Sequence, residues 1–145
     1  MTLTMCLDFD GVIHSYTSPW THAARIDDPP VDGAFDFIIR ALSRDWQVVV
    51  HSSRLGQSPN APEAMIRWFL VHGFPEDKLA NDAGDEEAIS QLWDEFPRLG
   101  IREPCLRLSA LKPAAFITLD DRALTFMGQW PDLDMLLLFK VWNKP

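Results

Sequence analysis

Short apolar runs alternate along this chain with longer stretches of helical periodicity. The runs at 4–7, 46–51 and 115–119 are rich in apolar and β-branched residues, which is typical of buried strands. In 32–44 and 62–72, apolar residues recur every three to four positions, which predicts two amphipathic helices. The alternation of strands and helices favours an α/β fold with a mostly parallel central sheet.

Further elements are predicted in the second half of the chain and before the first helix. We predict a helix over 85–96, a short strand over 105–108 and a last helix over 133–141. Residues 14–32 are polar and aromatic and end near a Pro-Pro pair, so we expect a loop or small flap there. Asp32 is predicted to cap the helix that follows this flap.

Length and composition indicate one domain over residues 1–145. The chain has 145 residues, the usual size of a domain, and 47% of them are hydrophobic. Its net charge of −8 opposes non-specific binding to nucleic acid or anionic membranes, but it allows a phosphate ester held through a metal. No apolar run approaches ~18 residues and the N-terminus has no secretory signal pattern, so we expect a cytoplasmic protein with no membrane partner.

A polar cluster follows each of the three apolar runs. Because the carboxyl ends of parallel strands meet at one edge of a sheet, where ligands bind, we expect the clusters to converge there. Two carboxylates crowded after the first run repel each other, and a divalent cation would relieve that repulsion. The clusters are Asp8, Asp10 and Gly11, then Ser52, Ser53 and Arg54, then Asp120, Asp121 and Arg122.

Four motifs, in this order, resemble those of the haloacid dehalogenase-like (HAD) hydrolase superfamily. The resemblance spans residues 3 to 122 and is closest to small bacterial and phage members. It implies a three-layer Rossmann-like fold and Mg²⁺-dependent phosphomonoester hydrolysis through an aspartyl-phosphate. Only residues 14–32 are available for a cap after the first motif, so we expect a minimal cap or none. The motifs are Asp8-Phe9-Asp10-Gly11-Val12, Val48-Val49-Val50-His51-Ser52, Lys112-Pro113 and Ile117-Thr118-Leu119-Asp120-Asp121.

The resemblance also implies catalytic roles. Asp8 would be the nucleophile and Asp10 the general acid and base. Ser52 would hydrogen-bond the phosphoryl group, although capping of the following turn is its alternative role. Lys112 would neutralise charge on the phosphoryl group and on Asp8, with Lys78 as the alternative lysine.

A Mg²⁺ site is implied by the same motifs. Its ligands would be the Asp8 carboxylate, the backbone carbonyl of Asp10 and the Asp121 carboxylate. Asp120 would be a second ligand or a hydrogen-bond acceptor beside the site. No histidine stands at metal-ligand spacing; His14 either packs in the domain or faces the site.

Substrate contacts are expected from the loops that follow the first two apolar runs and from the flap. Arg54 suits a phosphate because its guanidinium is a bidentate fork, although a surface charge is its alternative role. Ser53 and Gly11 are expected beside it. Tyr16 and Trp20 of the flap either stack on a base, cover the phosphate or pack against the domain. The expected substrate is a phosphorylated small molecule, a nucleotide or a nucleic-acid end.

A second function class is a catalytically silent HAD-like binding or regulatory module. The presence of Asp8, Asp10, Lys112 and Asp121 weighs against it. A phosphatase assay with and without Mg²⁺ separates the two classes. The sequence predicts neither the physiological substrate nor the oligomeric state.

Overall fold

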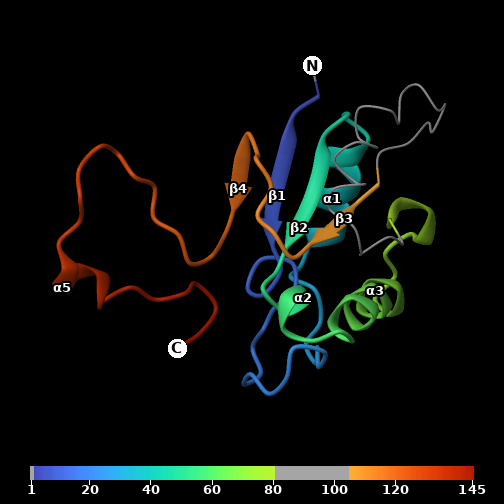
Figure 1. Cartoon of the computed structure of the whole chain (residues 1–145), viewed down its shortest axis with the longest axis horizontal. Helices are drawn as coiled ribbons and strands as arrows, with labels where there is room; N and C mark the ends of the chain where they lie inside the picture. Colours follow the sequence, from blue (N-terminus) through green and yellow to red (C-terminus); the bar gives the residue numbers. More distant parts are fainter. Residues whose placement is uncertain (1, 81–104) are drawn as a thin grey trace.

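The computed structural model describes residues 2–80 and 105–145, and a parallel sheet lies at its centre (Figure 1). Within these residues the sheet has four strands in the order β3-β2-β1-β4, and every neighbouring pair is parallel. The expected α/β architecture is confirmed, and so is the placement of the Asp8 strand between the other two apolar strands. The strands are β1 (Thr4–Asp8), β2 (Gln47–His51), β3 (Arg107–Ser109) and β4 (Ile117–Leu119).

The two middle strands are buried because both of their faces are covered. Met5 and Leu7 of β1 and Val48 and Val50 of β2 belong to the main hydrophobic core. The alternate residues Cys6 and Val49, which pair in register, face the other side and are also buried. This double burial explains why both strands read as continuous apolar runs in the sequence.

Helices α1 (Ala34–Leu42) and α3 (Ala61–Val71) pack on the face of the main core. Both were predicted from their periodicity. The capping role expected of Asp32 is wrong: Gly33 occupies the N-cap at φ 78°, and no side chain caps the helix. The buried residues of the two helices are Ile38, Ala41, Leu42, Ala61, Met65, Trp68 and Phe69.

Three shorter helical elements complete the described structure. They are α2 (Arg54–Gln57), the 3₁₀ helix η1 (Glu76–Lys78) and α5 (Leu133–Leu136). The last helix therefore ends five residues before the predicted end at 141. The helix predicted over 85–96 lies outside the described residues, so the three-layer arrangement stays a prediction.

The flap and the C-terminal segment both meet the loop after β1. The two ends of the flap pair with each other, since the Ser15 N–H donates to the Pro29 carbonyl and the Val31 N–H donates to Ile13. After β4 the chain swings away from the sheet and returns at its end (Figure 1). There the Trp142 indole N–H donates to the Gly11 carbonyl at 2.8 Å. Among the described residues, no helix is both long and apolar enough to cross a bilayer.

Candidate functional site

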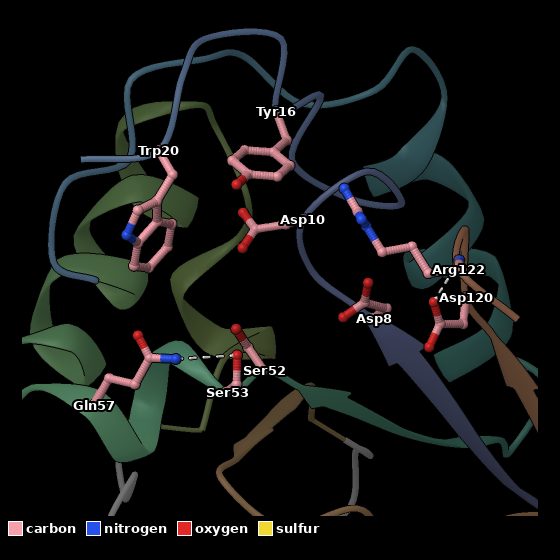
Figure 2. A pocket seen from close by; sticks show the side chains of 9 residues that line it. All are labelled: Asp8, Asp10, Tyr16, Trp20, Ser52, Ser53, Gln57, Asp120 and Arg122. Carbon is pink, nitrogen blue, oxygen red and sulfur yellow. Dashed lines mark hydrogen bonds between the residues drawn. The ribbon is translucent and has the colours of Figure 1, made fainter. Parts of the chain in front are cut away.

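A pocket lies at the carboxyl edge of the sheet, where the three polar clusters converge as the topology predicted (Figure 2). Its cavity volume is about 550 Å³, which exceeds what one phosphate group requires and is within the usual range of ligand sites. The lining residues come from β1, the flap, the β2–α2 segment and the end of β4. They are Asp8, Asp10, Tyr16, Trp20, Ser52, Ser53, Gln57, Asp120 and Arg122.

Three carboxylates form an acidic cluster on the β4 side of the pocket. Asp8, Asp120 and Asp121 each offer an oxygen, and these oxygens all lie within 4.8 Å of one another. Asp121 Oδ1 is buried and has no hydrogen-bond partner in the described part of the chain. Clustered carboxylates with an unpartnered oxygen are the donor set that a hard divalent cation takes. The residues present therefore fit a metal ion.

Gly11 determines how closely the loop after β1 approaches this cluster. Its φ is +84°, and a Cβ at this position would lie 2.2 Å from Asp121 Oδ2. Only glycine meets both conditions, the left-handed backbone and the close approach. Gly11 therefore allows the loop to lie directly against the Asp121 carboxylate, and it is not among the residues that line the pocket.

The environment of Asp8 favours its neutral form. Burial raises the pKa of Asp8 to about 7, and the negative charges of Asp120 and Asp121 act in the same direction. A hydrogen bond from the Phe9 backbone opposes this shift. A cation bound among the three carboxylates would favour the ionised form, which is the form that a nucleophile needs.

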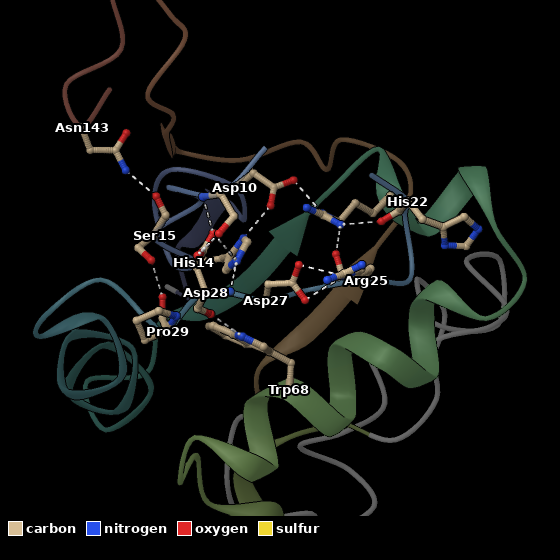
Figure 3. Close-up of polar contacts among 12 residues, drawn as sticks. Asp10, His14, Ser15, His22, Arg25, Asp27, Asp28, Pro29, Trp68 and Asn143 are labelled. Atoms are coloured by element: carbon tan, nitrogen blue, oxygen red, sulfur yellow. Dashed lines mark hydrogen bonds and ion pairs between the residues drawn. The ribbon is translucent and has the colours of Figure 1, made fainter. Parts of the chain in front are cut away.

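Asp10, two residues further on, has the opposite environment. Burial alone would raise the pKa of Asp10, but hydrogen bonds from His14 and Arg54 and the charge of Arg54 lower it. His14 Nδ1 lies 2.8 Å from Oδ1, and Arg54 Nε donates to Oδ2 at 2.7 Å. The Asp28 backbone N–H donates to His14 Nε2 at 3.2 Å, so this ring nitrogen is the acceptor and Nδ1 carries the proton (Figure 3).

Arg54 joins Asp10 to the flap. Its side chain is only 2% exposed, and Nη1 donates to the backbone carbonyls of His22, Ala23 and Arg25. The guanidinium carbon also lies 4.4 Å from the ring centroid of Trp20. Arg54 was expected either to bind substrate phosphate or to be a surface charge; in the structure it is buried in protein contacts and does not line the pocket.

No family model, curated protein or solved structure matches this chain. The resemblance to HAD hydrolases therefore stays a prediction from the motifs. The pocket, the acidic cluster and the contrasting environments of Asp8 and Asp10 come from the structure and do not depend on that resemblance.

The remaining predicted residues have different relations to the pocket. Ser52 lines it, is buried and accepts a hydrogen bond from the Arg54 backbone N–H at 3.3 Å. Ser53 also lines it, and Gln57 Nε2 donates to its hydroxyl at 3.5 Å. Lys112 is exposed and is not a lining residue. Burial raises the pKa of Cys6 and the charge of Lys112 opposes this, so Lys112 lies within electrostatic reach of β1.

Several residues in or beside the pocket were given no role from the sequence, although Arg122 was expected at this edge as part of the third polar cluster. Arg122 and Gln57 line the pocket, and the nitrogen of Lys144 lies 3.7 Å from the ring centroid of Tyr16. Arg122 follows the last motif directly, so its position next to Asp121 was an available signal. Nothing in the sequence indicates that Lys144, at the far end of the chain, returns to the flap.

Proposed function

We propose that this protein is a Mg²⁺-dependent phosphomonoester hydrolase that forms an aspartyl-phosphate on Asp8. One observation carries the proposal: Asp8 belongs both to the acidic cluster and to the wall of the pocket. A carboxylate that contacts a bound cation and a bound substrate is placed to attack phosphorus. The motif order, the parallel sheet and the small flap support a HAD-like, minimally capped member of that superfamily.

In the proposed first step, an Asp8 oxygen attacks phosphorus and the bond from phosphorus to the leaving oxygen breaks. The leaving oxygen takes a proton from Asp10. In the second step, water attacks the phosphorus of the aspartyl-phosphate, Asp10 takes the water proton, and phosphate leaves from a regenerated Asp8. When bound, Mg²⁺ would supply positive charge that offsets the carboxylates and the phosphoryl oxygens.

The resting state of Asp10 suits the second step better than the first. Both of its oxygens accept hydrogen bonds and its pKa is lowered, so it is ionised at neutral pH and ready to take a proton from water. Protonation of the leaving group needs the scarce neutral form. Substrates with acidic leaving groups, such as p-nitrophenyl phosphate, should therefore react faster than alkyl phosphates.

The other roles follow the motifs. Ser52 is proposed to hydrogen-bond the phosphoryl group, and its place on the pocket wall supports this. Lys112 is proposed to add positive charge from outside the lining, and its electrostatic reach toward β1 supports this.

The test is hydrolysis of p-nitrophenyl phosphate and of a panel of phosphomonoesters that includes nucleotides and 3′- and 5′-phosphorylated oligonucleotides. Phosphate release should require Mg²⁺ and stop in EDTA. The Asp8→Asn variant, purified in the same way, controls for contaminating phosphatases. A folded protein that binds Mg²⁺ and is inert toward the whole panel would contradict the proposal and favour a catalytically silent binding module.

A further inference from the structure

The charge balance of the pocket is incomplete on the β4 side. Three carboxylates gather at Asp8, Asp120 and Asp121, and a single divalent cation leaves one negative charge over when all three are ionised. A phosphomonoester dianion would add two more. Binding such a substrate therefore needs a further cation whose charge is not already used by the protein.

Two of the cations near the site do not meet this need. Arg54 is ion-paired with Asp10 and donates to three backbone carbonyls of the flap. Lys112, proposed above to add charge from outside the lining, is not among the residues that could contact the phosphoryl group from the pocket wall. Arg122 differs from both because it lines the pocket and, within the described residues, its guanidinium makes no hydrogen bond or ion pair.

The backbone around Arg122 fixes where its side chain starts. The Arg122 N–H donates to Asp120 Oδ1 at 2.8 Å, which closes the turn directly after β4. Figure 2 shows the side chain extending from this turn past Asp8, with its guanidinium pointing toward the middle of the pocket. A guanidinium in this position faces the space between the nucleophile and Asp10.

We propose that Arg122 binds the phosphoryl group of the substrate. This inference rests on the proposed function for the class of ligand. The planar guanidinium offers two parallel N–H donors to two phosphoryl oxygens and brings a positive charge to a dianionic group. Arg122 thereby has the substrate contact that the sequence alone suggested for Arg54, while Arg54 holds Asp10 and the flap.

The experiment measures binding of inorganic phosphate in saturating Mg²⁺ by calorimetry, independently of turnover. Arg122→Gln should weaken phosphate binding about tenfold or more, because a charge-assisted bidentate contact is lost. Arg122→Lys keeps the charge but not the pair of parallel N–H donors, so its phosphate affinity should lie between those of the unchanged protein and Arg122→Gln. Arg67→Gln removes the same charge from an exposed position on α3 and should bind phosphate within about twofold of the unchanged protein.

A second measurement separates loss of the phosphoryl contact from loss of the metal. The Mg²⁺-induced rise in melting temperature should persist in Arg122→Gln, since the three carboxylates remain. Equal phosphate affinity in Arg122→Gln and Arg67→Gln would overturn the proposal, and so would absence of phosphate binding by the unchanged protein. If Arg122→Gln weakens phosphate binding while no phosphomonoester is hydrolysed, the assignment of Arg122 stands and the proposed hydrolase activity fails.

Discussion

The flap side and the β4 side of the pocket balance their charges in different ways. On the flap side, Asp10 is held between His14 and Arg54, and both of its oxygens have donors. On the β4 side, Asp8 and its two neighbouring carboxylates lie together, and Asp121 keeps a buried oxygen without a partner among the described residues. The flap side is complete as protein structure, whereas the β4 side leaves its carboxylates crowded, an arrangement that the proposed cation would complete.

This difference explains why two carboxylates at the end of one strand have opposite pKa shifts. Burial and like charges raise the pKa of Asp8 to about 7, whereas donors from His14 and Arg54 lower that of Asp10 despite burial. Neighbouring carboxyl groups whose environments separate their pKa values in this way are suited to different chemical roles. The predictions below test each side, beginning with the largest expected effect.

The largest effect should come from Asp8→Asn. An amide is a very poor nucleophile, so turnover should fall by at least about 10³-fold for every substrate. Asp10→Asn should cost about 10² to 10⁴, with a larger loss for alkyl phosphates than for p-nitrophenyl phosphate, because hydrolysis of the aspartyl-phosphate is slowed for both but protonation of the leaving group matters only for the alkyl esters. Steady-state rates with both substrates check this. Equal losses in the two variants on both substrates would contradict the separate roles, and exposed Asp36→Asn is the matched control.

The next largest effect concerns stability on the flap side. Arg54→Ala leaves Asp10 without its cation and three flap carbonyls without their donor, so the free energy of unfolding should fall by about 3 kcal/mol. Arg25→Ala, which removes an exposed ion pair with Asp27, should cost less than about 1 kcal/mol. Urea unfolding measures both. A loss in Arg54→Ala no larger than in Arg25→Ala would show that the flap does not depend on this contact.

The sheet was predictable because its pattern is local. Strands β1, β2 and β4 and helices α1 and α3 were recognisable from the spacing of their own apolar residues. The N-cap of α1 was not, because Gly33 adopts a left-handed conformation that displaces Asp32 from the capping position. The last helix was predicted too long because apolar spacing continues past Leu136, although the side chains there are exposed rather than packed.

The site was predictable in its members more than in their roles. Strand ends place Asp8, Asp10 and Ser52 at one edge, and parallel pairing is enough to predict that. The role of Arg54 depends on carbonyls 29 to 32 positions earlier in the chain, and no local pattern records such partners. Arg122 lines the pocket and Arg54 does not, so the proposed role of Arg122 also depends on tertiary structure.

A smaller effect should appear in the pH dependence of stability without metal. The folded pKa of Asp8 is about 7 and its usual value is 3.8, so between these pH values the folded protein binds more protons than the unfolded chain. Stability therefore falls as pH rises through this window. Asp8→Asn should abolish this fall and raise the free energy of unfolding by about 1–2 kcal/mol at pH 8 in EDTA. The gain is smaller than the full pKa shift implies, because partial exposure of Asp8 screens the charge.

Mg²⁺ should reverse this trend, because it favours the ionised carboxylates. The Mg²⁺-induced rise in melting temperature should grow from pH 5 to pH 8 and should be lost in Asp121→Ala. Thermal unfolding with Mg²⁺ or EDTA measures it, with Asp36→Asn as the control. A rise of the same size in Asp121→Ala would exclude Asp121 from the cation site, and a rise independent of pH would contradict the pKa assigned to Asp8.

The smallest effect should come from the contact that links the C-terminal segment to the β4 side. Trp142 donates its indole N–H to the carbonyl of Gly11, the residue whose backbone lies against Asp121. Trp142→Phe keeps an aromatic ring and deletes the donor, so it should lower the free energy of unfolding by about 0.5–1.5 kcal/mol. Because the Gly11 loop is then held less firmly, Mg²⁺ affinity should fall slightly as well.

The matched control for this contact is Trp130→Phe, in the same segment. Trp130 is 88% exposed, so its replacement should leave both stability and Mg²⁺ affinity unchanged. Chemical unfolding and Mg²⁺ titration of the two variants measure the difference. If Trp142→Phe lowers stability without changing Mg²⁺ affinity, the segment only fastens the chain end to the fold. If both quantities fall, the C-terminal segment helps to position the cation site through Gly11, and the β4 side depends on a residue distant in the sequence, as the flap side does.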